Sequence, residues 1–151
     1  MPNPKSTASI AGHPLHPMLV PFPIAFFVGT LGADFLYLRD GDPFFFMMTQ
    51  WLLGSGIVLA LVAALVGFTD FVGDGRIRAL GIAWGHFLGN LGVVAIEAFN
   101  LYRRCIIGAG AIEGLGVMLS LAAVLLMLVT GWLGWEMVYR RRVGIADDIA
   151  P

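Results

Sequence analysis

The chain has 151 residues and a formal net charge of −1; 58% of its residues are hydrophobic and only 13% are charged. Soluble domains carry about 25% charged residues, so this composition excludes an ordinary soluble protein, and the balanced charge gives no reason to expect a nucleic-acid partner. Cys105 is the only cysteine, which excludes an internal disulfide and a cysteine-based zinc or iron–sulfur site. We expect Cys105 itself to be inert.

Long charge-free stretches predict membrane spans. Residues 43–69 and 114–135 contain no Asp, Glu, Lys or Arg, and a span needs about 20 apolar residues. The first apolar run is too long and too rich in proline for a cleaved signal peptide, so we interpret it as a retained span. The sequence therefore predicts a multi-pass membrane protein in contact with the lipid bilayer.

We predict an all-α fold, an integral membrane four-helix bundle that runs up-down-up-down over residues 13–139. The spans are expected at about 17–38, 43–68, 79–101 and 114–139, between a loose N-terminal tail (1–12) and a C-terminal tail (140–151). Both termini then lie on one side. The terminal side holds six basic residues and the other side three (Arg39, Arg103 and Arg104), which favours cytoplasmic termini.

The opening of the first span, residues 13–23, reads HPLHPMLVPFP. A residue before proline avoids the α region and proline favours the first helical position, so His16 is predicted as an N-cap and His13 in the extended approach. Pro21 and Pro23 should loosen the first turns. A helix N-terminus favours the neutral imidazole, which is the form that binds metals.

The third span carries a polar stripe. His86, Asn90, Val93, Glu97 and Asn100 fall at helical spacing on one face. Ionisable groups within a span are costly and usually face the bundle interior, so this face is expected to turn inward. A ridge of small residues beside it, Gly81, Gly85, Gly89 and Gly92, would allow close packing between spans or a homodimer.

Topology alone gathers polar residues at two ends of the bundle. The end that holds both termini receives His13, His16, Asp70, His86, Asn90, Glu136 and Tyr139. The opposite end receives Asp34, Glu97 and Asn100, with Arg39, Arg103 and Arg104 beyond them. All three histidines of the chain are therefore expected at one depth.

The sharpest functional hypothesis is a haem b, or a transition metal, held near the cytoplasmic face. Bis-imidazole ligation needs histidines from different helices of a bundle, and His86 with His16 (or His13) meets that requirement. Asn90, Glu136 and Tyr139 could orient a ligand ring, and Arg76 and Arg78 would suit haem propionates. Such a protein would pass electrons to a redox partner or a larger membrane complex.

Two other hypotheses compete with this one. The polar residues could serve helix packing, in a non-catalytic accessory or assembly subunit, or the third span's stripe could form an ion or proton path. For Asp34 and Glu97 we favour pairing with Arg39 or Arg103 near the surface over such a path. No nucleophile–base arrangement or phosphate loop is visible.

Several motifs carry a family resemblance. GHPLHPMLVPFPIAFFVG at the start, LVGFTDF at 65–71, His86 with Asn90, and TGWLGWEMVYR at 130–140 resemble an uncharacterised bacterial family, the domain of unknown function numbered twenty-two thirty-one. The resemblance covers about residues 11–145 and implies four helices in a bacterial inner membrane, with no settled activity. Trp135 replaces a glycine of the family pattern, and Arg141 and Arg142 replace a His-Gly pair, so no fourth histidine is carried over.

Overall fold

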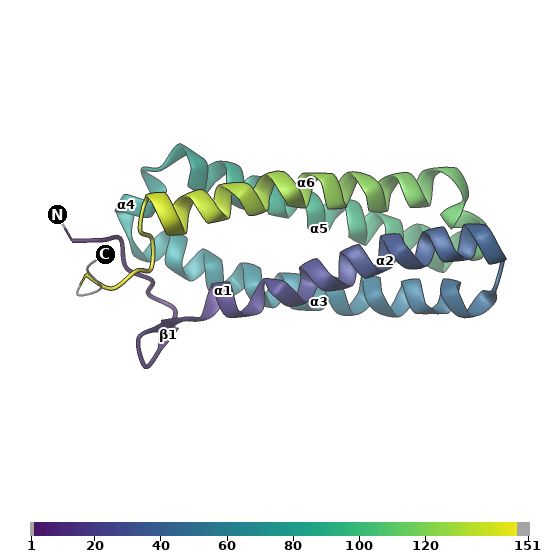
Figure 1. Ribbon diagram of the computed structural model, residues 1–151, viewed down its shortest axis with the longest axis horizontal. Helices are drawn as coiled ribbons and strands as arrows, with labels where there is room; N and C mark the ends of the chain where they lie inside the picture. The colour runs from purple at the N-terminus through teal and green to yellow at the C-terminus, as the bar shows by residue number, and fades with distance from the viewer. Residues whose placement is uncertain (1, 148–151) are drawn as a thin grey trace.

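The protein is an elongated bundle of long helices. A computed structural model describes residues 2–147, and within them four helices are long and apolar enough to cross a membrane. They run alternately up and down, and the described parts of the N-terminal and C-terminal tails lie at the same end of the bundle (Figure 1). The predicted all-α four-helix membrane fold is confirmed.

The first span is broken into two helices and the others are nearly continuous. In chain order the elements are β1 (Ser9–Ile10), β2 (His13–Pro14), α1 (Leu15–Leu19), α2 (Pro21–Asp40), α3 (Pro43–Gly73), α4 (Gly75–Arg78), α5 (Gly81–Ile107), η1 (Ala109–Ala111), η2 (Ile112–Gly116), α6 (Val117–Trp135) and η3 (Glu136–Arg140). Around the bundle, α2 contacts α3, α3 contacts α5, α5 contacts α6, and α6 contacts α2.

The start of the first span differs from the sequence prediction. The helix α1 begins at Leu15 with Pro14 as its N-cap, so His16 is a helical residue and the predicted N-cap role is wrong. Pro17 fits in the first turn because the first backbone N–H groups of a helix have no partner within the helix. The break falls at Val20, just before Pro21, whose ring cannot supply an N–H to continue the ladder.

Where the sequence suggested a loose N-terminal tail, the structure has a docked one. A short antiparallel hairpin joins β1 to β2, with Ala11 and Gly12 at positive φ in its turn. Upstream of it, Asp70 near the end of α3 accepts hydrogen bonds from the Ala8 backbone N–H at 2.7 Å and from the Ser6 hydroxyl at 2.9 Å. The tail is therefore tied across the end of the bundle.

The two tails also hold each other. The backbone N–H of Gly144 donates to the carbonyl of Pro4 at 2.8 Å, and Arg76 on α4 donates to the carbonyl of Pro2 at 2.6 Å. The Arg76 guanidinium bonded to Asp74 holds the pKa of that carboxyl well below its usual range. Residues 148–151 of the predicted C-terminal tail lie outside the described part of the chain.

The middle of the bundle is apolar both in its core and on its outer surface. Phe27, Leu53, Val93, Ala123 and Met127, which come from all four spans, pack together in its centre. Large apolar side chains also cover the outside, as in Trp51 and Leu65, which are 74% and 69% exposed. An outer surface of this kind suits hydrocarbon, so its exposure in the isolated chain is what a bilayer-embedded bundle requires.

The close approach of α2 and α3 depends on a glycine and generates a stability prediction. A Cβ on Gly56 would lie 2.6 Å from Cε1 of the buried Phe27 and 3.2 Å from Cβ of Phe26. Overpacking a core costs about 1–3 kcal/mol, so Gly56→Ala should lower the thermal unfolding midpoint in detergent. Gly54→Ala is the matched control, because a Cβ at Gly54 meets nothing within 4 Å; equal losses in the two variants would contradict this packing.

Candidate functional site

His16 is fixed on the inner side of the first span. Its Nδ1 lies 2.8 Å from the backbone carbonyl oxygen of Ala63 on α3. The helix α3 can come this close because residue 67 is glycine: a Cβ there would lie 2.8 Å from Nδ1 of His16. The half-buried ring is thus held between the first and second spans.

His86 is fixed in the same way between the third and fourth spans. Its Nδ1 lies 2.8 Å from the carbonyl oxygen of Thr130 on α6, and a Cβ on Gly134 would lie 3.0 Å from its Cε1. Asn90, one turn further along α5, donates to the His86 carbonyl at 2.7 Å and accepts from the Thr130 hydroxyl at 3.3 Å. Asn90 therefore stabilises the backbone on both sides of the ring.

The two rings meet inside the bundle, and we call them the histidine pair. The ring centroids of His16 and His86 are 6.0 Å apart, and the ring planes are nearly perpendicular at 85°. A carbonyl oxygen can only accept, so each Nδ1 is the N–H donor of its ring in the neutral form. In that tautomer each Nε2 carries a free lone pair, and Nε2 is a common metal-ligating atom of histidine.

Other residues predicted for this site lie elsewhere. His13 is in β2, exposed, with Nδ1 3.0 Å from the carbonyl oxygen of Ala11, so only two of the three histidines meet. Tyr139 is 69% exposed and lies against Trp135 with the two ring planes tilted, because the helix turns this aromatic row outward, where an aromatic belt belongs. Glu136 reaches Arg140 at 3.5 Å and not the histidine pair.

Two arginines predicted near haem propionates are both on the exposed helix α4. Arg76 is paired with Asp74 at 2.6 Å, which occupies its guanidinium. Arg78 forms no salt bridge with any residue in the described range 2–147. Its carbonyl accepts a hydrogen bond from the Trp84 indole at 3.0 Å, which ties α4 to the start of α5.

A second polar cluster lies at the opposite end of the bundle, and we call it the ion-pair cluster. Arg104 donates two hydrogen bonds to Asp34, at 2.6 and 2.9 Å, and neither side chain is exposed. Ser120 on α6 donates to Asp34 at 2.7 Å. Asn100 donates to Ser120 at 2.9 Å and to Glu97 at 3.1 Å. The cluster joins α2, α5 and α6.

The predicted surface pairing of Asp34 and Glu97 is wrong. Arg39 pairs instead with its neighbour Asp40, and Arg103 donates to the carbonyl of Ala111. The sequence did contain the signal for the true partner. Arg104 follows Asn100 by four residues and so continues the inward stripe of α5, whereas Arg103 falls about 100° away around the helix.

The two polar clusters are separated by the apolar core. The inward stripe of α5 passes from Asn90 through the buried Val93 to Glu97, and Val93 packs against Phe27 and Leu53 from the facing helices. An ion path along this stripe would have to cross that layer. The arrangement therefore favours two separate sites over one continuous pathway.

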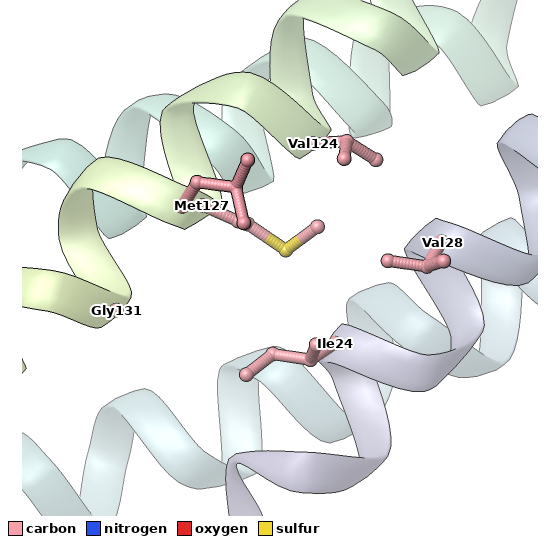
Figure 2. A pocket seen from close by; sticks show the side chains of 6 residues that line it. Ile24, Val28, Val124, Met127 and Gly131 are labelled. Atoms are coloured by element: carbon pink, nitrogen blue, oxygen red, sulfur yellow. The ribbon is translucent and has the colours of Figure 1, made fainter.

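An apolar groove opens between α2 and α6 (Figure 2). It has a volume of about 260 Å³ and is lined by Ile24, Val28, Val124, Met127, Leu128 and Gly131. Gly131 follows Thr130, whose carbonyl holds His86, so the groove begins beside the histidine layer. Its walls are suited to a hydrocarbon or an aromatic ring system and offer no charged side chain.

Comparison with known proteins identifies a family and no individual relative. The family model described as "Predicted membrane protein (DUF2231)" matches residues 12–147. No curated protein and no solved structure matches the chain.

The ion-pair cluster generates a prediction at Ser120. Ser120→Ala removes the hydroxyl that donates to Asp34 and accepts from Asn100. Each of these buried partners then loses one hydrogen bond. Hydrogen bonds between membrane helices are worth about 1–2 kcal/mol, so the unfolding midpoint in detergent should fall accordingly. Ser55→Ala on α3 is the control, since Ser55 forms no side-chain hydrogen bond within the described chain. An unfolding midpoint that is unchanged in Ser120→Ala would contradict this hydrogen-bond network.

Proposed function

The chain belongs to the DUF2231 family of predicted membrane proteins. From the geometry of the histidine pair we propose that it is a small membrane haem protein in which His16 and His86 ligate a haem b. The observation that carries the proposal is the histidine pair: two imidazoles from different spans, with ring centroids 6.0 Å apart and with both Nδ1 atoms bonded to carbonyl oxygens.

The separation of the two rings supports ligation of one metal between them. If both rings held one metal, their centroids would lie about 6 Å apart, because a metal–imidazole bond is about 2.0 Å long and the ring centre lies roughly 1 Å beyond the nitrogen. The observed separation is 6.0 Å. The carbonyl bonds to Nδ1 are the outer hydrogen bonds that orient ligating histidines in proteins.

The donor set favours haem over a bare ion. Within residues 2–147 no three His, Cys, Asp or Glu side chains are grouped closely enough to hold a metal ion. A bare transition metal generally needs three or four protein ligands, whereas a porphyrin brings four nitrogens of its own and asks the protein for two. The histidine pair supplies that number.

The surroundings supply an apolar wall and one basic residue. The groove between α2 and α6 begins beside His86, but its volume of about 260 Å³ is smaller than a porphyrin. The proposal therefore requires the side chains of the groove to part when haem binds. Arg78, exposed at the same end of the bundle, is the residue we assign to a propionate.

When bound, haem supplies a one-electron redox couple, and the proposed role is electron transfer to a redox partner or larger complex in a bacterial inner membrane. The basic residues near the span ends support termini on the cytoplasmic side. The histidine pair would then lie near the cytoplasmic face, because His16 is close to the N-terminus and His86 is about one and a half turns into α5.

A second candidate is a non-catalytic accessory or assembly subunit. The observation that favours it is the same pair of carbonyl bonds, since His16 joins α1 to α3 and His86 joins α5 to α6. In that case the two histidines stabilise the bundle by holding four helices at one depth. The two candidates differ in whether the Nε2 atoms of His16 and His86 bind a metal.

Absorption spectroscopy separates the two candidates. We expect the full-length protein, purified in detergent from haem-supplied cells, to show a Soret band and about one iron per chain by elemental analysis. His16→Ala or His86→Ala should reduce the band to a tenth or less, because one axial ligand is lost. His13→Ala is the matched control and should leave the band unchanged, since His13 lies outside the bundle.

A colourless protein without iron, with histidine variants that only lower the unfolding midpoint, would reject haem and support the accessory subunit. Copper or zinc bound in place of iron, and lost in both variants, would keep the histidine pair as a metal site but reject haem.

A further inference from the structure

The ion-pair cluster contains a buried oxygen without a partner. Glu97 is 0% exposed, and its Oε1 has no hydrogen-bond partner within the described residues. Its other oxygen, Oε2, receives a single bond from the neutral amide of Asn100 at 3.1 Å. A buried carboxylate is stabilised by donors to both of its oxygens, so an ionised Glu97 would carry its charge on a group that receives only one hydrogen bond.

The charges of the cluster point to a protonated carboxyl. The cluster holds two carboxyl groups, on Asp34 and Glu97, and one guanidinium, on Arg104, which is bonded to Asp34 through two nitrogens. If both carboxyls were ionised, one negative charge would remain uncompensated among buried groups, which costs several kcal/mol. One proton on one carboxyl makes the cluster neutral.

The hydrogen bonds decide which carboxyl takes the proton. Asp34 accepts bonds from Arg104 and from the Ser120 hydroxyl, an environment that stabilises a carboxylate. Among residues 2–147, Glu97 accepts only from Asn100, which also donates to Ser120 and to the carbonyl of Gly116. The proton therefore belongs on Glu97.

No other charged group on the neighbouring helices changes this count. The part of α3 from Pro43 to Thr69 has no charged residue. On α2, Tyr37 packs against Phe46, and on α5, Arg103 is directed to the carbonyl of Ala111. The turn after α5 covers the cluster with the fully buried Ala111 and Ile112, while its own Glu113 is exposed.

We propose that the ion-pair cluster is a proton-binding site within the membrane domain, which holds one exchangeable proton on Glu97. The ligand is a proton and not a metal cation, because Glu97 offers one free oxygen and the neighbouring oxygens are already bonded to donors. A Na⁺ or Ca²⁺ ion needs several oxygen ligands at once. The site lies at the opposite end of the bundle from the histidine pair and does not depend on haem.

Infrared spectroscopy of the folded, detergent-purified protein tests this directly. At neutral pH the wild-type protein should show the C=O stretching band of a protonated carboxylic acid, and the band should shift in D₂O because its proton exchanges. Glu97→Gln should abolish the band. Glu113→Gln is the matched control and should leave the band intact, since Glu113 is an exposed carboxyl.

A second variant tests the charge count. In Asp34→Asn, Arg104 retains Glu97 as its only nearby carboxyl, so Glu97 should ionise and the band should disappear although Glu97 is still present. Thermal unfolding of each variant establishes that it is folded. If Asp34→Asn does not fold, the comparison of wild type with Glu97→Gln still decides the proposal.

Two results would overturn the proposal. One is a wild-type spectrum without a carboxylic-acid band at neutral pH, or with a band that survives Glu97→Gln. The other is loss of the band when NaCl or CaCl₂ is added at constant pH, which would show that the site exchanges its proton for a metal cation.

Discussion

The fold depends on the requirement that polar groups inside a membrane be satisfied by the protein itself. Arg104 illustrates it: a guanidinium with 0% side-chain exposure is held by Asp34 from another helix. Removing one member of a buried ion pair typically costs about 3–5 kcal/mol, because the other charge is left without a partner. The pair therefore links α2 to α5 across the bundle, and Ser120 adds α6 to the same point.

The histidine pair plays the corresponding role at the other end. His16 and His86 each bind a carbonyl on the next helix, so that all four spans are joined at one depth. Between the two polar layers lies the apolar core around Leu53 and Val93. This division separates the proposed redox chemistry, near the termini, from the proposed proton on Glu97, near the opposite loops.

Much of this arrangement followed from the sequence because it depends on periodicity. Charge-free stretches gave the four spans, and helical spacing gave the inward stripe of α5. The juxtaposition of His16 and His86 followed from topology. Continuing the stripe by four residues from Asn100 also reaches Arg104, so helical spacing alone can identify it as an inward residue.

Other features could not be predicted from spacing. Which of His13 and His16 enters the bundle depends on the hairpin that draws His13 outward. The docked tail depends on Asp70 accepting bonds from residues more than 60 positions away. Ser120 appears as one small polar residue in an apolar run, and its partners become clear only when α2, α5 and α6 are assembled. Contacts between distant segments have no period in the sequence.

Low-temperature electron paramagnetic resonance of the oxidised protein tests most directly the proposal that both imidazoles would ligate one haem iron. If both histidines held the haem in their present orientation, with ring planes at 85°, we expect a low-spin ferric signal of the strongly anisotropic kind. The signal should vanish in both His16→Ala and His86→Ala. A high-spin signal in the wild-type protein, or a low-spin signal that persists in either variant, would contradict it.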